Sequence, residues 1–375
     1  MKLLITGACG FVGSTLTEAL LEHSDSLEII GIDNFSRNGS WLNRNKLVAK
    51  GVNLIHGDIR NAADLEALGP FDWVIDAAAN PSVLAGVDGK SSSRQLVEHN
   101  LGGTINLLEA CKRWNAGFIL LSTSRVYSIP PLVGLAVEVK DHAYTPILDG
   151  SLPGISERGI SEEFSTAPPV SLYGSTKLTS ETLALEYGEA FDFPVWINRC
   201  GVMAGAGQFG KPDQGIFAFW IHSWREGRPL KYIGFDGMGH QVRDCLHPRD
   251  LAPLVLKQFG ASPISASQDF SVSAFPKVIN VSGGSESAMS LRQLSEWCAD
   301  RFPNSETPSL PESNLPTVRS EAPPAIRPFD LPWVVLDSDC AASRWEWKSD
   351  TKTMDVLAEI ADFAAATPSW ISVSA

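Results

Sequence analysis

The sequence has few cysteines and histidines, and neither type is spaced to bind a metal. The six cysteines of the 375-residue chain are scattered without a C-x-x-C pair, and the seven histidines are equally dispersed. This spacing excludes the common zinc motifs and is typical of free thiols in a reducing compartment. We therefore expect no metal site and a cytoplasmic protein.

Long hydrophobic runs, basic clusters, repeats and low-complexity tracts are also missing. The apolar run at the N-terminus is only a few residues long, so neither a signal peptide nor a membrane span is expected. Lys and Arg number 30 against 43 Asp and Glu, and the formal net charge is −13. Nucleic-acid binding normally requires a basic stripe, so we expect neither a nucleic acid nor a membrane as a partner.

The first 33 residues carry a dinucleotide-binding pattern. An apolar strand at 3–6 leads into three glycines spaced G-x-x-G-x-x-G, and a helix is expected from Ser14 to about His23. A second strand at 27–32 ends at Asp33, whose carboxylate is suited to ribose hydroxyls and would repel a 2'-phosphate. The pattern therefore predicts NAD rather than NADP as the cofactor. The contacts expected in this region are Gly7, Gly10, Phe11, Val12, Gly13 and Asp33.

Strand-like and helix-like segments alternate along the rest of the chain, which is typical of a doubly wound parallel sheet of the α/β class. We predict an NAD-binding Rossmann domain over 1–198, with a Pro/Gly-rich insertion near 130–169. A smaller C-terminal substrate lobe is expected over 199–375, partly interleaved with the Rossmann domain at about 246–258. Further strands are expected at 52–55, 73–76, 117–121, 195–198 and 278–281, helices at 93–114, 290–302 and 354–365, and a proline-rich connection at 305–328.

The ends of the predicted strands supply further cofactor candidates, since ligands bind at the carboxyl ends of parallel strands. Asp58 is placed to bond the adenine edge. The small Ala78 and Ala79 would allow close approach of a cofactor, although tight packing explains them equally well. The neighbouring cofactor candidates are Asn34, Ser36, Arg37, Ile59 and Asn100.

Three residues predict acid–base chemistry. Tyr173 and Lys177 are four residues apart, so on a helix both project from one face. A nearby ammonium favours the phenolate form of a tyrosine and makes it a usable general base. Thr123, at the end of the strand that begins at Gly117, is placed to hold the reacting oxygen.

Together these motifs resemble the extended short-chain dehydrogenase/reductases of the NAD-dependent epimerase/dehydratase family, over nearly the whole chain. The resemblance implies a nucleotide-sugar substrate, oxidation to a transient keto sugar, and Thr123, Tyr173 and Lys177 as catalytic residues. It also implies a homodimer, with its seam on the helices after residues 93 and 171. The substrate contacts that it implies are Thr123, Ser124, Arg199, Arg243 and Arg327, the last two as phosphate ligands.

Less generic segments resemble the CDP-paratose (CDP-tyvelose) 2-epimerase subgroup of that family. They are 32–39, 56–61 and 207–220, where Gln208 or Gln214 would read the base and the aromatic side chains would either stack on it or pack in a helix core. Ser124 and Arg125 replace the subgroup's usual pair after Thr123, and no acid pair of the dehydratase kind is present. This favours epimerisation over dehydration.

Three other interpretations stay open. They are a UDP-sugar 4-epimerase, another nucleotide-sugar dehydrogenase or reductase, and a non-enzymatic NAD sensor. The insertion near 130–169 is either a lid that reshapes sugar specificity or a peripheral loop.

Overall fold

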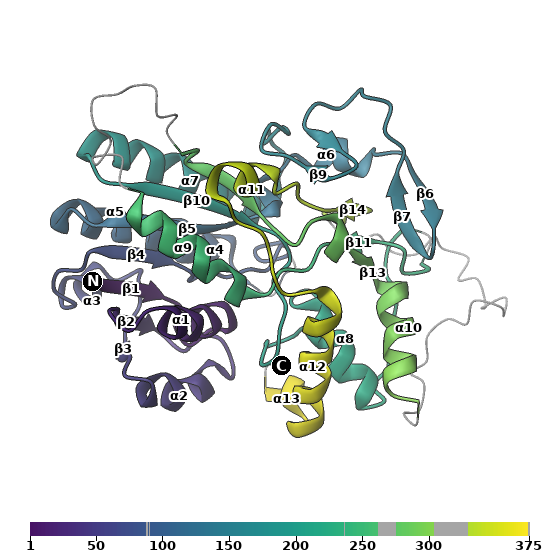
Figure 1. Cartoon of the computed structure of the whole chain (residues 1–375), viewed down its shortest axis with the longest axis horizontal. Helices are drawn as coiled ribbons and strands as arrows, with labels where there is room; N and C mark the ends of the chain where they lie inside the picture. Colours follow the sequence, from purple (N-terminus) through teal and green to yellow (C-terminus); the bar gives the residue numbers. More distant parts are fainter. Residues whose placement is uncertain (88, 90, 236, 262–274, 304–328, 374–375) are drawn as a thin grey trace.

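Seven of the described strands form one parallel sheet (Figure 1). The computed structural model describes all residues except 88, 90, 236, 262–274, 304–328 and 374–375. The order is β3-β2-β1-β4-β5-β10-β12, and all neighbouring pairs are parallel. The strands are β1 (Lys2–Thr6), β2 (Glu28–Asp33), β3 (Asn53–His56), β4 (Trp73–Asp76), β5 (Gly117–Thr123), β10 (Val195–Cys200) and β12 (Val278–Val281). The predicted doubly wound α/β fold is confirmed.

Helices cover both faces of this sheet, which explains why its strands read as nearly continuous apolar runs. On one face, Leu16, Leu254 and Trp345 belong to the same buried cluster. On the other, Leu107 and Ala184 pack with the sheet. The first face carries α1 (Phe11–His23), α2 (Arg44–Ala49), α9 (Leu251–Gly260) and α11 (Asp339–Trp345), and the second carries α3 (Ala62–Glu66), α5 (Gly103–Trp114) and α7 (Ser171–Phe191).

The strand order reverses beside β1. From β1 the chain passes to β2 and β3 on one side, and later to β4, β5, β10 and β12 on the other. A doubly wound sheet opens a crevice at the carboxyl ends of its strands at such a reversal. The glycine-rich loop after β1 and the segment after β4 therefore border a single crevice.

A second lobe lies beside the sheet, on the right of Figure 1. The buried aromatic side chains of Phe217, Trp220 and Trp224 pack with Leu294 and Ile360 in its core. These three side chains of the aromatic run after residue 216 belong to the helix core, and the stacking of the run on a base stays a prediction. The lobe contains α8 (Ile216–Arg225), α10 (Leu291–Arg301), α12 (Thr353–Ala366), α13 (Trp370–Val373) and a small sheet of β13 (Met289–Ser290), β11 (Val242–Arg243) and β14 (Trp333–Val334).

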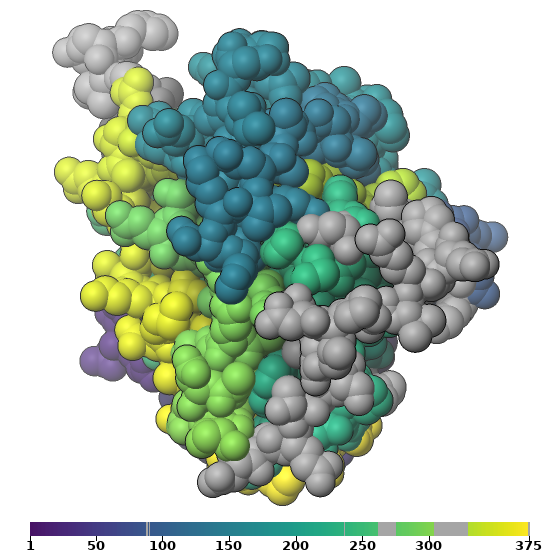
Figure 2. Space-filling view, turned by 90° about the vertical axis from the view of Figure 1, so that its right-hand side faces the viewer, coloured from purple at the N-terminus to yellow at the C-terminus, as the bar shows by residue number. Residues whose placement is uncertain are grey.

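The insertion is packed onto this lobe. It folds into α6 (Ile129–Val133) and two hairpins, β6 (Val137–Lys140) with β7 (Ala143–Pro146), and β8 (Ile155–Ser156) with β9 (Gly159–Ile160). Its buried Tyr144 and Phe164 share a cluster with Trp333. Ser290 donates a hydrogen bond to the carbonyl oxygen of His142, and Figure 2 shows the blue-green insertion above the green α10. The insertion is therefore packed against the second lobe, and its role as a lid stays a prediction.

Several boundaries differ from the predicted ones. The first helix begins at Phe11 rather than Ser14, because the last glycine of the motif lies inside its first turn. The long helix predicted at 93–114 consists of α4 (Ser93–Val97), a π-helical turn η2 (Glu98–Gly102) and α5. The sheet also takes β12 from beyond residue 199, so the interleaving of the two parts exceeds 246–258. The domain limits themselves stay a prediction, and the proline-rich connection lies outside the described residues.

Candidate active site

The glycine-rich loop brings α1 directly onto β1. Gly7 has a φ of +59°, and a Cβ on Gly13 would lie 2.2 Å from the carbonyl oxygen of Gly7. A Cβ on Gly7 would lie 3.0 Å from Cα of Ala78, in the segment after β4. No larger side chain fits at these places, so backbone N–H groups at the start of α1 border the crevice. This cradle suits the pyrophosphate of a dinucleotide.

Asp33 is held beside this loop. Its carboxylate accepts hydrogen bonds from the backbone N–H groups of Cys9, at 2.9 Å, and Phe35, at 2.8 Å. Burial raises the pKa of Asp33, and the bonds from Phe35 and Cys9 oppose that shift. The buried carboxylate at the end of β2 is the feature expected of a ribose-binding acid, and it fits NAD.

Neighbouring cofactor candidates are bound to one another. Asn34 donates to Asp58 at 2.9 Å, and the Arg60 guanidinium holds the pKa of Asp58 well below its usual value. Ile59 packs against Gly103 of α5. The Ser36 N–H donates to the side-chain oxygen of Asn34, and the Ala78 N–H donates to the Thr6 hydroxyl. Phe11 and Val12 are the first residues of α1, directly after Gly10. Ala79 is exposed.

Asn100 connects two parts of the site. Its side-chain oxygen accepts from the N–H of Asn80 at 2.8 Å, and its amide donates to the Thr176 hydroxyl at 3.2 Å. Asn100 lies in the π-helical turn, a backbone irregularity that is common at functional sites. It thereby connects the segment after β4 to α7, the helix that carries Tyr173.

Thr123, Tyr173 and Lys177 are brought together. Thr123 ends β5, and Tyr173 and Lys177 lie one turn apart on α7 with 7% and 2% of their surface exposed. Burial raises the pKa of Tyr173, while a hydrogen bond with Thr123 and the charge of Arg125 oppose the rise. Burial also lowers the pKa of Lys177, against the charges of Asp76, Glu181 and Cys200.

The expected lowering of the Tyr173 pKa by Lys177 is therefore not found. The cation that opposes the rise in the Tyr173 pKa is Arg125. The spacing of Tyr173 and Lys177 placed both side chains on one face, but it did not determine what the ammonium group faces.

Arg199 is not placed as a substrate ligand, which corrects the prediction. Its guanidinium donates to Glu181 at 2.7 Å in a buried ion pair and to the Tyr127 hydroxyl at 3.4 Å. Glu181 also accepts from the Ser122 hydroxyl at 2.5 Å. A buried arginine needs a buried partner, and this ion pair takes up donors that a substrate would use.

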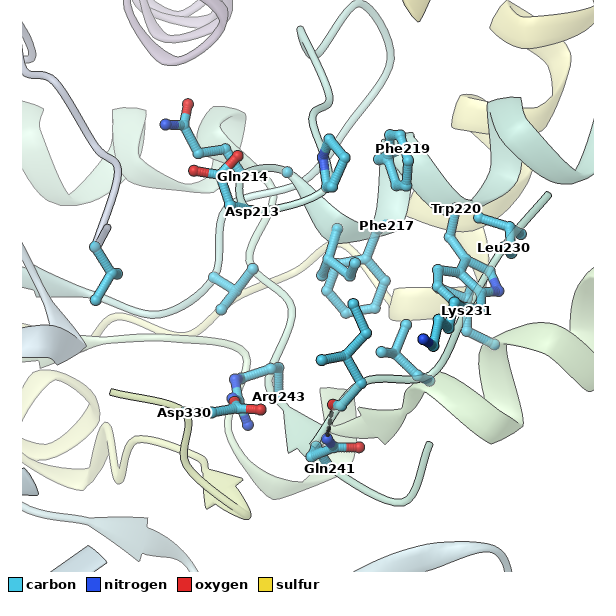
Figure 3. A pocket seen from close by; sticks show the side chains of 18 of the residues that line it. Asp213, Gln214, Phe217, Phe219, Trp220, Leu230, Lys231, Gln241, Arg243 and Asp330 are labelled. Atoms are coloured by element: carbon cyan, nitrogen blue, oxygen red, sulfur yellow. Dashed lines mark hydrogen bonds and ion pairs between the residues drawn. The ribbon is translucent and has the colours of Figure 1, made fainter. Parts of the chain in front are cut away.

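A cavity of about 370 Å³ opens in the second lobe (Figure 3). Phe217, Phe219 and Trp220 form one wall, and the Arg243–Asp330 ion pair, with its nitrogen and oxygen 3.1 Å apart, lies at another. Arg243 and Gln214 thus line a pocket, as substrate residues should. The Gln214 side chain also accepts from Arg37 at 2.7 Å, so these two predicted ligands bind each other across the lobes.

Two other predicted substrate residues, Gln208 and Ser124, are not among the described residues that line this cavity. The Gln208 amide donates to the carbonyl oxygen of Met203 at 2.8 Å. Ser124 is buried in the turn after β5. Arg327 lies outside the described residues. Conversely, Arg125 and Lys231 line the cavity, and neither was predicted. The sequence signal that could have identified Arg125 as a site residue is its position two residues after Thr123.

Among the described residues, no group of three or more His, Cys, Asp or Glu side chains is arranged to hold a metal ion. No helix of the described ranges has the length and apolar character needed to cross a membrane.

Comparisons with known proteins agree with this geometry. The model of the NAD dependent epimerase/dehydratase family matches residues 3–263. CDP-paratose 2-epimerase of Salmonella typhi is 31% identical over 68% of this chain and 73% of that protein. UDP-glucuronate 4-epimerase 3 of Arabidopsis thaliana is 30% identical over 64% of this chain. The match covers 50% of the plant enzyme, so this chain spans about half of its length.

A solved structure shares the fold. The UDP-glucuronic acid 4-epimerase of Bacillus cereus, in complex with UDP-glucuronic acid and NAD, has a TM-score of 0.70 at 24% identity, covering 98% of this chain and 99% of that one. The glycine cradle, the buried acid after β2 and the family match support the same conclusion. The chain is an enzyme of the NAD dependent epimerase/dehydratase family, and its cofactor is NAD.

Proposed function

We propose that the protein inverts one carbon of a nucleotide sugar through a transient keto sugar. The observation that carries this proposal is the contact of Tyr173 with Thr123, one helical turn from Lys177, in a chain whose second lobe holds a cavity lined by Arg243. Ser124 and Arg125, rather than an acid pair, follow Thr123, so the chain lacks a group there to protonate a leaving hydroxide. This favours epimerisation.

In this proposal Tyr173 is the general base. Its phenolate takes the proton from a sugar hydroxyl, and the Thr123 hydroxyl holds the oxygen as it becomes a carbonyl. Lys177 lies buried one turn further along the same helix. NAD, when bound, supplies the hydride acceptor and later the hydride donor. The keto sugar presents its other face, and Tyr173 returns the proton.

In this proposal the cavity binds the diphosphate and the base of the nucleotide sugar. Arg243 offers a planar fork of donors to a diphosphate, and Asp330 orients that fork. Burial lowers the pKa of Arg243, while the charge of Asp330 opposes the shift. The aromatic wall of Phe217, Phe219 and Trp220 suits the base or the sugar face.

CDP-paratose is the first candidate substrate. The identity of 31% to CDP-paratose 2-epimerase covers more of both proteins than the match to the plant UDP-glucuronate 4-epimerase does. Since the latter is 30% identical, a UDP-sugar 4-epimerase is the second candidate.

We further propose a cytoplasmic homodimer. The six cysteines are free, which suits a reducing compartment. Val97 of α4 and Leu172 and Phe191 of α7 are exposed apolar side chains on the helices expected at the seam. Sedimentation of the purified protein should give twice the chain mass, and a monomer would contradict this part.

Proton NMR of the purified protein tests the function. CDP-paratose, UDP-glucuronate and UDP-glucose are each added without cofactor, with Tyr173→Phe protein as the control. A new anomeric signal from CDP-tyvelose supports the first candidate and shows that NAD is retained. A signal from a galacto-configured UDP-sugar instead supports the second. No change with any of the three sugars would contradict both substrates.

A further inference from the structure

The segment from Gly207 to Gly215 leads from the end of β10 into the second lobe. Its two end glycines have φ angles of +76° and +65°. Near its end the backbone groups of Lys211 and Gln214 bond each other at 2.7 and 3.0 Å and close a tight turn. Asp213 and Gln214 of this turn line the cavity of the second lobe (Figure 3). One short segment therefore forms part of the cavity wall.

This segment is bonded to the chain that follows β2. The Arg37 guanidinium donates to the side-chain oxygen of Gln214 at 2.7 Å and to the carbonyl oxygen of Phe209. A Cβ atom on Gly39 would lie 2.7 Å from the Phe209 ring, so the ring touches the backbone there. Arg37 and Gly39 follow Asp33 by four and six residues. The contacts therefore lie at the edge of the crevice that carries the predicted ribose acid.

The same segment also reaches the opposite edge of the crevice. Ser82, in the segment after β4, donates from its hydroxyl to the Asp213 carboxylate at 2.8 Å. Just before the segment, a Cβ atom on Gly205 would lie 3.1 Å from the ring of Phe11, the first residue of α1. This stretch of chain therefore touches the segments after β2 and β4 and the start of α1, all of which border the crevice.

The second lobe holds the segment from the other side. The Phe209 ring stacks on Trp370 with ring centroids 5.3 Å apart. The Trp370 indole N–H donates to the carbonyl oxygen of Gln208 at 3.0 Å. The segment is therefore fixed to the lobe by an aromatic pair, and the side chains of Arg37 and Ser82 fasten it across the crevice.

We propose that residues 207–215 form a clasp over the cofactor crevice, and that Arg37 and Ser82 are the positioning residues that keep it closed. The proposal goes beyond the proposed function, since it concerns the retention of NAD and needs no sugar. A dinucleotide in such a fold extends from the acid after β2 across the start of α1 towards the end of β4. The clasp contacts all three places. Release of the cofactor therefore requires the bonds of Arg37 and Ser82 to break.

A clasp contact and a direct contact with NAD have different kinetic effects. Breaking a bond within the clasp makes opening easier, and opening precedes both entry and exit of the cofactor. Exchange then becomes faster while the dissociation constant changes little. Loss of a direct contact with NAD speeds release alone, so the dissociation constant rises by the same factor. Comparing the two quantities therefore identifies what each residue does.

Two variants remove clasp bonds at residues outside the predicted cofactor set. Gln214→Met keeps the length of the side chain and removes the acceptor for Arg37. Ser82→Ala removes the donor to Asp213. Each loses one hydrogen bond to a charged group, so we expect NAD exchange to become about tenfold faster. The dissociation constant for NAD should change by less than about threefold.

Exchange is measured on the holoenzyme. The enzyme is loaded with radiolabelled NAD, an excess of unlabelled NAD is added, and the loss of label from the protein is followed. Equilibrium dialysis gives the dissociation constant. The matched controls are Arg94→Met and Ser26→Ala, at two exposed positions, and both should exchange NAD at the wild-type rate.

Arg37 needs a combined test, because it is also a predicted cofactor residue. Arg37→Met should speed exchange more than Gln214→Met does, since it also loses the bond to Phe209. The double variant should exchange no faster than Arg37→Met alone, because both changes break the same bond. Effects that multiply in the double variant would contradict the pairing as the cause.

Unchanged exchange in both Q214M and S82A would overturn the clasp, and so would a dissociation constant that rises as much as the exchange rate. Should Q214M not fold, S82A decides by the same criteria. The clasp and the proposed function fail separately. If no nucleotide sugar reacts but exchange responds as expected, the proposed function fails and the clasp stands. If a sugar reacts and exchange does not respond, only the clasp fails.

Discussion

A Cβ atom on Gly174 would lie 2.3 Å from the carbonyl oxygen of Arg125. The helix that carries Tyr173 therefore touches the turn after β5 at a place where no side chain fits. This contact brings Tyr173 within hydrogen-bonding reach of Thr123. The absence of a side chain at residue 174 is thus a condition for assembling the reaction centre.

Replacing Gly174 by Ala should displace α7 from this turn. We expect turnover to fall by about tenfold or more and the free energy of unfolding to fall by about 1–3 kcal/mol, because an added methyl group overpacks a tight contact. Kinetics and thermal unfolding measure the two effects. Gly260→Ala is the control, since a Cβ there would meet none of the described residues within 4 Å. Equal effects of the two variants would contradict this view of the contact.

Replacing Tyr173 by Phe removes only the hydroxyl. We expect turnover to fall by about 100- to 10,000-fold, the usual contribution of general acid–base catalysis, with bound NAD unchanged. Initial rates and the absorbance of released cofactor measure the two. Tyr187→Phe is the control, because Tyr187 is half-buried at the far end of the same helix and its hydroxyl donates to Glu109. Near-normal turnover of Y173F would exclude Tyr173 as the base.

Asp33 should determine the choice between NAD and NADP. We expect Asp33→Asn to weaken NAD binding by about tenfold and to reduce the preference over NADP, because it loses charged hydrogen bonds and the repulsion of a 2'-phosphate. Binding titrations with both cofactors measure this, with the exposed Asp25→Asn as the control. An unchanged preference in D33N would argue against the ribose assignment.

The same carboxylate predicts a pH dependence. Burial raises the pKa of Asp33 above 3.8, so the cofactor-free fold takes up this proton at a higher pH than the unfolded chain does. Acidification through that pKa should favour the cofactor-free fold slightly and weaken NAD binding, which needs the ionised form. NAD titrations from pH 7 downwards should show this loss in the wild type, and D33N should lack it.

The buried Glu181–Arg199 pair should matter for stability. Glu181→Gln or Arg199→Met leaves one buried charge unpaired, and we expect each to lower the free energy of unfolding by about 3–5 kcal/mol. The double variant Glu181→Leu/Arg199→Met should recover much of the loss. Urea unfolding measures these values. Arg94→Gln, which breaks an exposed pair with Glu98, should cost less than about 1 kcal/mol.

The sequence by itself determined the apolar strands of the parallel sheet, the glycine cradle, Asp33, and the placement of Tyr173 and Lys177 on one helix face. Each of these depends on spacing within one short segment. Three glycines at fixed intervals specify a tight turn and a close helix, and residues four apart share a helix face. A strand of the sheet ends where its apolar run ends. Such local patterns can be recognised in the sequence without knowledge of the tertiary contacts.

The tertiary structure alone decided what each charged side chain binds. Arg199 pairs with Glu181, Arg37 bonds Gln214 from 177 residues away, and Arg125 is anchored by Phe329 from 204 residues away. An arginine in a sequence looks the same whether it meets a substrate or a buried acid. Whether a charge is neutralised by the protein or left for a ligand depends on burial and on segments brought together by folding, and local spacing does not encode either.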